Sequence, residues 1–108
     1  MKYQNKKIIV NGIKFDSKKE ANRYYELLLL QKAKIITNLE LQPKFLLQDG
    51  FKKNGKTYRR IEYIADFKYI ENGKTIVEDV KGFKTEVFKL KHKLFEYKYP
   101  ELELKIVR

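Results

Sequence analysis

Two aspartates and a lysine flank a predicted hairpin turn in the second half of the chain: Asp66, Asp79 and Lys81. The dipeptide Asn-Gly at residues 72–73 lies between them, and this dipeptide among alternating apolar residues is a strong signal of a two-residue β-turn. Counting back from that turn places Asp66 opposite Asp79, and Ile64 opposite Lys81. Opposed residues of a hairpin have Cβ atoms about 5 Å apart on one face, so the sequence predicts a pair of adjacent carboxylates with a lysine beside them.

Paired carboxylates have a defined chemistry. Like charges directly opposite one another are destabilising, and a cation relieves the repulsion. Hard carboxylate oxygens suit Mg²⁺ or Mn²⁺, which would polarise a phosphate ester and activate a water molecule, with Lys81 beside the developing charge. The structural alternative is an ordinary strand whose exposed acids, Asp66 and Asp79, form salt bridges with Lys68 and Lys81.

The opposite face of the same predicted hairpin is apolar, and both aspartates avoid it. It carries Tyr63, Ala65, Phe67, Tyr69, Ile76 and Val80. Glu78 falls on this core face in the same register, and the sequence assigns it no role.

The spacing of these residues resembles the motif of the PD-(D/E)XK nuclease superfamily: Ile64-Ala65-Asp66, then Asp79-Val80-Lys81 thirteen residues after the first aspartate. Residues 15–21 resemble the first-helix glutamate segment of Holliday-junction resolvases and small phage-encoded endonucleases. Ala65 stands where the motif has proline, a departure that weakens the resemblance more than the chemistry.

The resemblance implies a metal-dependent DNA endonuclease that acts in DNA recombination, with branched DNA such as a Holliday junction as a candidate substrate. It implies that Glu20, Asp66 and Asp79 are metal ligands and that Lys81 is the catalytic lysine. Mg²⁺ is the implied cofactor, with Mn²⁺ as a substitute. Glu20 has a competing role, because Ser17 and Glu20 also match a helix capping box.

The charge of the chain favours a polyanionic partner. It has 25 Lys and Arg against 14 Asp and Glu, a net charge of +11, and neutralised phosphates release counterions. The residues expected to contact DNA phosphates are Lys18, Lys19, Arg23, Lys84 and Lys91. The alternative is a basic surface that serves solubility alone.

Hydrophobic periodicity predicts an α/β fold in the order helix, three strands, helix, strand, after an N-terminal hairpin. The hairpin spans residues 8–15, the helices 17–35 and 85–99, and the strands 39–47, 58–70, 75–81 and 102–107. Residues 49–57 read as a polar connection. This order is that of a restriction-endonuclease-like core, a mixed central sheet flanked by two helices.

Length and composition set the remaining expectations. The 108 residues form a single nuclease domain, 1–108. There is no cysteine, no membrane-spanning apolar run, and no apolar stretch of a secretory leader in residues 1–7. We expect a cytoplasmic protein (in the host cytoplasm if phage-encoded) that acts as a homodimer. The competing functions are a non-catalytic nucleic-acid-binding module and a nuclease-fold subunit of a larger complex.

Overall fold

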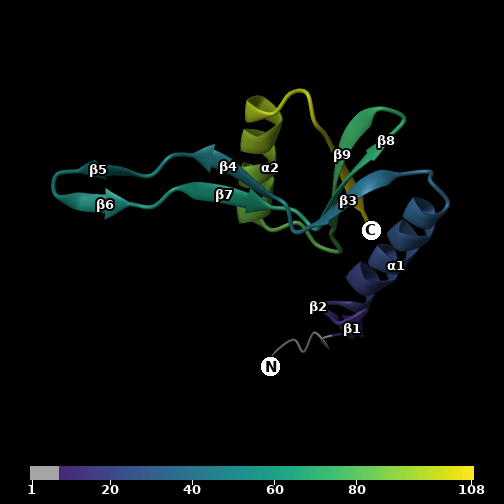
Figure 1. Cartoon of the computed structure of the whole chain (residues 1–108). Coiled ribbons are helices and arrows are strands. Elements are labelled where there is room, and N and C mark those ends of the chain that lie inside the picture. Colours follow the sequence, from purple (N-terminus) through teal and green to yellow (C-terminus); the bar gives the residue numbers. More distant parts are fainter. Residues whose placement is uncertain (1–7) are drawn as a thin grey trace.

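A computed structural model describes residues 8–108, and Figure 1 shows a mixed α/β fold with a two-stranded ribbon that projects from its body. Residues 1–7, in which no secretory leader was predicted, lie outside the described part. The elements in chain order are β1 (Ile8–Val10), β2 (Ile13–Phe15), α1 (Lys18–Lys32), β3 (Thr37–Leu41), β4 (Lys44–Gln48), β5 (Phe51–Lys53), β6 (Lys56–Tyr58), β7 (Ile61–Ile64), β8 (Phe67–Glu71), β9 (Lys74–Val80), α2 (Glu86–Lys98) and β10 (Glu103–Val107).

The central sheet has the strand order β10-β9-β8-β3. β3, β8 and β9 are antiparallel neighbours, whereas β10 runs parallel to β9. A parallel neighbour needs a crossover connection, and α2 supplies it. The predicted order of helix, three strands, helix and strand is therefore confirmed for this sheet.

Three Asn-Gly turns shape the antiparallel part of the fold. The asparagine and glycine at 11–12, 54–55 and 72–73 all have positive φ, between 51° and 77°. Paired positive φ values are those of the turn that matches strand twist. The turn at 72–73 sets the register Glu71–Lys74 through Phe67–Glu78, as predicted.

The two longest predicted strands are each interrupted, which the sequence analysis did not foresee in full. Gln42 and Pro43 separate β3 from β4, and Ala65 and Asp66 separate β7 from β8. Hydrogen bonds bridge the break: Gln42 N donates to Asp66 O (2.9 Å) and Ala65 N to Pro43 O (3.1 Å). The two segments thus stay paired while changing direction. Beyond the break, β4 pairs with β7 outside the central sheet. Ile64 consequently lies opposite Lys44, not Lys81.

This break also changes which face each side chain occupies. Phe67 and Tyr69 pack on the α1 side of the sheet with Tyr24, Leu27 and Ile76. Tyr63 and Ala65, which were predicted on the same face, pack instead with Val77, Phe88 and Phe95 on the α2 side. The sheet is therefore covered on both faces, and the simple alternation assumed from the sequence fails across Ala65–Asp66.

Both helices begin as predicted but turn slightly different faces inward. Ser17 and Thr85 cap them, each accepting a hydrogen bond from the backbone N–H three residues on. Their hydrophobic spacing suggests inward-facing positions, but four of these apolar side chains are more than half exposed: Tyr25, Leu29, Val87 and Leu90. Leu27 is buried in α1 instead.

Glu78 has a clear structural role. Its side chain is fully buried, and Arg23 of α1 donates to both of its oxygens, from Nε (2.6 Å) and Nη2 (2.8 Å). The Tyr69 hydroxyl donates a third hydrogen bond at 2.5 Å. Arg23 was predicted to contact DNA, but its guanidinium is engaged here and with Glu26. The ion pair fixes α1 against the middle of the sheet.

Replacing Arg23 by methionine tests this anchor. Arg23→Met leaves Glu78 buried without its cation, so we expect a loss of about 3 kcal/mol in the free energy of unfolding, measured by urea denaturation. The matched control is Glu26→Gln, which removes the exposed partner of the same arginine and should cost less than about 0.5 kcal/mol. Equal losses in the two variants would contradict the anchoring role.

Candidate active site

Asp79 lies on β9 and is 1% exposed. Its neighbour Glu78 points to the α1 side, so alternation along the strand sends Asp79 to the other side. The hydroxyl of Tyr63 donates a short hydrogen bond to Asp79 Oδ2. Asp79 Oδ1 lies 3.6 Å from the amine of Lys81. One oxygen is therefore held by the core, and the other faces the lysine.

Asp66 lies in the break between β7 and β8, directly beyond the last pair of the ladder. Its backbone N–H donates to Glu78 O (3.1 Å), and its carboxyl oxygen Oδ2 accepts from Val80 N (2.8 Å). The Asp66 and Asp79 carboxyl groups lie within hydrogen-bonding reach of each other. The predicted meeting of the two acids is thus present, though the regular pairing ends at Phe67 and Glu78.

The electrostatics of Asp66 follow from this crowding. Its pKa is raised to about 8, chiefly by burial and then by the hydrogen bond with Asp79. The N–H of Val80 opposes the shift, and the negative charge of Glu20 adds to it. With a pKa of about 8, the Asp66 carboxyl group is largely protonated at neutral pH and can donate a hydrogen bond to Asp79.

Glu20 brings the first helix to the site. Its backbone N–H donates to Ser17 Oγ (3.1 Å), which caps α1. Its carboxyl group is within hydrogen-bonding reach of Asp66 and near Asp79 and Lys81. Burial raises the pKa of Glu20, and the nearby Asp16 and Asp79 raise it further. The backbone thus serves the cap while the side chain faces the other acids.

Lys81 directly follows β9, where its backbone N–H donates to Val107 O of β10 (2.8 Å). Its side chain is 31% exposed, and its amine lies 4.8 Å from the centroid of the Phe88 ring. Two concavities include Lys81 in their lining, one together with Lys84 and the other together with Lys91. Both of these predicted phosphate contacts therefore lie beside the candidate site.

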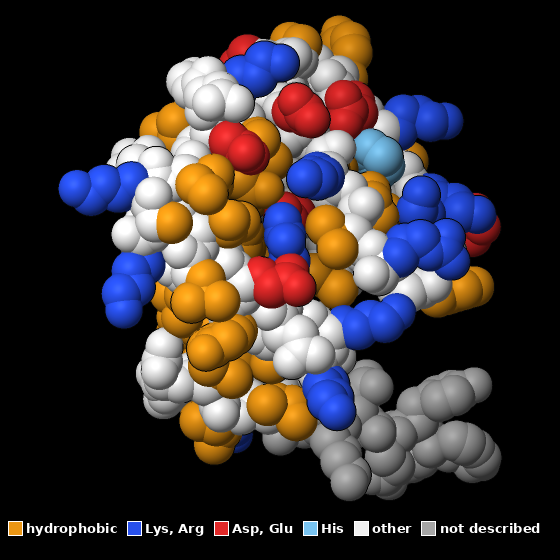
Figure 2. Space-filling model, turned by 90° about the vertical axis from the view of Figure 1, so that its right-hand side faces the viewer, with side chains coloured by type: hydrophobic (Ala, Val, Ile, Leu, Met, Phe, Trp, Pro, Cys, Tyr) orange, Lys and Arg blue, Asp and Glu red, His pale blue; other side chains and the backbone are white. Residues whose placement is uncertain are grey.

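The remaining predicted DNA contacts lie on α1. Lys18 and Lys19 are exposed in its first turn, and the Lys19 amine lies 3.9 Å from the position that a Cβ at Gly82 would take. Figure 2 shows the face of the molecule seen from the right of Figure 1, where basic side chains gather on the side that holds the histidine. The residues that line the concavity there are Lys84, Lys89, His92, Lys93 and Glu96.

No ready-made metal cage exists in residues 8–108: no three Asp, Glu, His or Cys side chains form a set that could hold an ion as they stand. The acids are instead occupied with one another, with Tyr63 and with Val80 N. The structural alternative of exposed, salt-bridged acids holds only in part: Asp79 does pair with Lys81, but Asp79 is buried, and Lys68 pairs with Glu40.

Comparison with known proteins places the chain by sequence. A family described as "Protein of unknown function (DUF1064)" matches residues 1–108. The chain belongs to this family. Neither the curated proteins nor the solved structures contain a match. Within residues 8–108, no helix has the length and apolarity required to cross a membrane.

The clustered acids of this DUF1064 protein lead to a pH-dependent stability. The pKa of Asp66 is about 8 in the folded chain, against 3.8 ordinarily. The folded state therefore binds the proton more tightly, and this contribution to stability is complete below pH 4 and is lost as the pH rises through 8.

An asparagine at position 66 can still accept a hydrogen bond from Val80 N and can donate one to Asp79. In EDTA, Asp66→Asn should be about 1 kcal/mol more stable than the parent at pH 8 and equal to it near pH 4, by thermal unfolding at both pH values. A variant less stable at pH 8 would contradict this account.

Tyr63 is the residue of the site that sequence reasoning missed, because its aromatic ring fits a core position. Tyr63→Phe keeps the ring among Phe45, Phe88 and Phe95 and removes only the donor to Asp79. We expect a loss of about 1–3 kcal/mol in the free energy of unfolding for the unsatisfied carboxylate. The control is Tyr99→Phe, which removes a hydroxyl bonded to the backbone oxygen of Leu46. A loss no greater in Tyr63→Phe than in this control would argue against a special role of the first hydroxyl.

Proposed function

We propose that the chain is a metal-dependent endonuclease that hydrolyses DNA phosphodiester bonds with the residues of a PD-(D/E)XK site. The observation that carries the proposal is the convergence of Glu20, Asp66, Asp79 and Lys81 from three separate segments: α1, the break between β7 and β8, and the end of β9. A structural network has no need to bring three carboxylates and a lysine together, with all but Asp79 partly exposed. The order of helices and strands in the central sheet supports the same proposal.

The donor set suits a small divalent cation. Three carboxylates offer hard oxygens, which Mg²⁺ and Mn²⁺ prefer. Burial first, and the neighbouring acids second, raise the pKa of Asp66 and of Glu20, and a bound cation would favour their charged forms. Glu20, Asp66 and Asp79 would hold the ion. When bound, it would polarise the phosphate and lower the pKa of a water ligand. Its binding requires Asp66 to give up its proton, so the affinity should increase with pH.

The chain's own residues have distinct roles in this proposal. Lys81 places a positive charge where negative charge develops on the phosphate oxygens. Tyr63 is a positioning residue that fixes the orientation of Asp79. In the reaction a water oxygen bonds to phosphorus, the bond from phosphorus to one ester oxygen breaks, and that oxygen leaves with a proton. Both products are then ends of a cut strand.

The substrate in this proposal is duplex DNA, with branched DNA as a preferred form. The net charge of +11 favours a polyanion. Contacts to phosphates carry no sequence information, so recognition through DNA shape fits this proposal. A homodimer would suit paired cuts on two strands.

The decisive experiment is a cleavage assay on supercoiled plasmid, linear duplex, flap and four-way-junction DNA, with Mg²⁺ or with EDTA. We expect cutting only with the metal. Asp66→Asn, Asp79→Asn and Lys81→Met should each reduce the rate at least 100-fold while DNA binding in EDTA persists. Intact protein that cuts none of these substrates with Mg²⁺ or Mn²⁺ would refute the enzyme and favour a non-catalytic binding module.

A matched pair of variants separates the two roles of the first helix. Glu20→Gln should lose cleavage but keep its melting temperature, because the backbone N–H that bonds Ser17 remains. Ser17→Ala removes the cap and should cost about 1 kcal/mol of stability with cleavage retained below the melting transition. The opposite pattern would assign Glu20 to the cap alone.

A further inference from the structure

The two-stranded ribbon that leaves the body of the molecule is the largest feature that the catalytic proposal does not use. Its outgoing segment carries β4 and β5, and its returning segment carries β6 and β7. The Asn54-Gly55 turn joins the two segments. Figure 1 shows it extending away from the central sheet. β4 and β7 pack against α2, but every residue from 48 to 60 is exposed. Residues 49–57 were predicted to be a polar connection, whereas they form strand β5 and most of strand β6.

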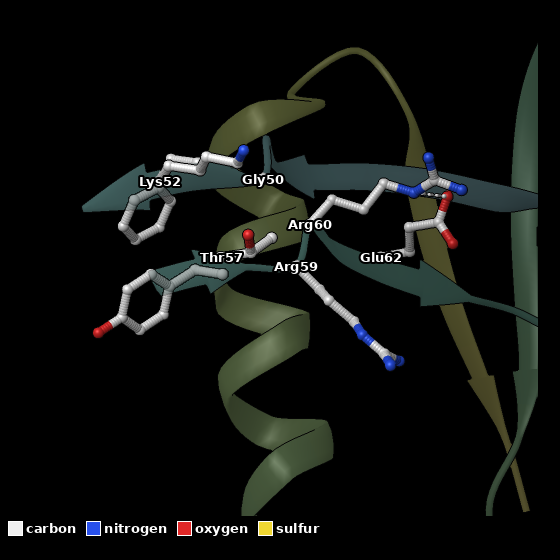
Figure 3. Close-up of a pocket in the computed structure, with 8 residues that line it drawn as sticks. Gly50, Lys52, Thr57, Arg59, Arg60 and Glu62 are labelled. Carbon is white, nitrogen blue, oxygen red and sulfur yellow. Dashed lines mark ion pairs between the residues drawn. The ribbon is translucent and has the colours of Figure 1, made fainter. Parts of the chain in front are cut away.

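The outer part of the ribbon is strongly basic. Five of the eleven residues from 50 to 60 are basic and none is acidic: Lys52, Lys53, Lys56, Arg59 and Arg60. Lys53 pairs directly with Lys56 across the strands, although like charges in that position are destabilising. Figure 3 shows Arg59 and Arg60 pointing in different directions, Arg60 toward Glu62. The cations therefore spread over more than one side of the ribbon.

The ribbon is built to persist without a core. An isolated two-stranded hairpin is marginal in water, but the rings of Phe51 and Tyr58 stack across the strands with centroids 4.7 Å apart. Lys56 adds a contact at 5.3 Å from the Tyr58 ring centroid. Gly50 allows the strands to approach closely, since a Cβ there would lie 3.0 Å from the backbone oxygen of Tyr58. These contacts hold the extended form in which the basic side chains are presented.

We propose that this ribbon is a DNA-binding arm that lies along the duplex beside the candidate active site. A two-stranded β-ribbon fits the major groove of B-DNA, and the lysines and arginines would contact its phosphates. From Lys44 to Asn54 the ribbon spans about 33 Å at ~3.3 Å per residue, close to one helical turn of DNA, and its outer ~20 Å, from Gln48 to Asn54, is exposed throughout. The arm departs from the break that holds Asp66, so its contacts begin at the site and extend outward.

A different role is available to lysines on a free ribbon. Charges on exposed strands discourage pairing between molecules, and the aromatic pair could equally meet a second copy of the chain. Both alternatives predict that neutralising the arm changes self-association and leaves the affinity for DNA unchanged relative to other lysines. The test therefore measures both quantities.

The test compares two triple variants of the full chain with the same change of charge. The arm variant is Lys52→Gln/Lys53→Gln/Lys56→Gln. The control is Lys32→Gln/Lys74→Gln/Lys105→Gln, at exposed positions outside the ribbon. Binding of a labelled 30-bp duplex is measured by fluorescence anisotropy in EDTA from 50 to 300 mM NaCl. Circular dichroism and the melting temperature confirm that both variants are folded.

We expect the arm variant to bind at least about 10-fold more weakly than the parent at 100 mM NaCl. Its slope of log affinity against log salt should fall by roughly 2–3, because each lost phosphate contact removes about 0.9. The control should change the slope by less than about 1. Equal effects in the two variants, or a changed sedimentation coefficient with unchanged DNA affinity, would overturn the inference.

A second measurement rests on the proposed nuclease function and separates the two proposals. Two duplexes are compared, which extend ~6 bp or ~20 bp beyond the cleavage site. The parent should cut the longer duplex faster, because only that duplex is long enough to contact the whole arm. The arm variant should lose this preference. If the parent cuts no DNA but arm-dependent binding remains, the nuclease proposal fails alone. If it cuts both lengths equally and binding does not depend on the arm, the arm inference fails alone.

Discussion

The structure depends on the burial of two consecutive carboxylates in the central strand β9. Glu78 and Asp79 are both almost inaccessible to solvent, and alternation directs them to opposite faces of the sheet. Buried charges are costly unless they are paired and hydrogen-bonded. Glu78 meets this requirement fully through Arg23 and Tyr69. Asp79 meets it only in part, with Tyr63 on one oxygen and Lys81 at 3.6 Å from the other. The first carboxylate therefore builds the fold, while the second is left able to take another partner.

These two environments act together through α1. The pair between Arg23 and Glu78 fixes the register of the helix on the sheet, and Glu20 lies three residues earlier on the same helix, hence on the same side of it. Glu20 thereby reaches Asp66 and Asp79. A buried ion pair thus positions the group of acids at the candidate site. On α1 and on β9, a residue that stabilises the fold lies close to a residue of the candidate site. A substitution of Arg23 should therefore change both the stability and the geometry of the site.

Local signals in the sequence predicted much of this arrangement. The Asn72-Gly73 turn gave the register that brings Asp66 to Asp79, and Ser17 and Thr85 marked the starts of the helices. The break at Ala65–Asp66 was not predictable by alternation, because apolar residues continue through it and fit either face. Tyr63 therefore appeared to be core alone, and Glu78 had no partner until the helix was docked. Such facts depend on tertiary contacts between residues far apart in the chain, such as the 55 positions between Arg23 and Glu78.

The same break links the site to the ribbon. If β7 and β8 were one regular strand, Asp66 would be one more ladder residue, and the ribbon would continue in the direction of the central sheet. The irregular pair instead lets the Asp66 carboxyl accept from Val80 N and turns β4 and β7 out of the sheet. One local distortion therefore sets both the position of a candidate ligand and the direction of the basic arm. In the function proposed above, a phosphate backbone bound by the ribbon would be placed relative to Asp66 through only a few residues of paired backbone. Binding energy from the ribbon would then help to orient a phosphate at the acids, as contacts remote from the reacting bond do in catalysis.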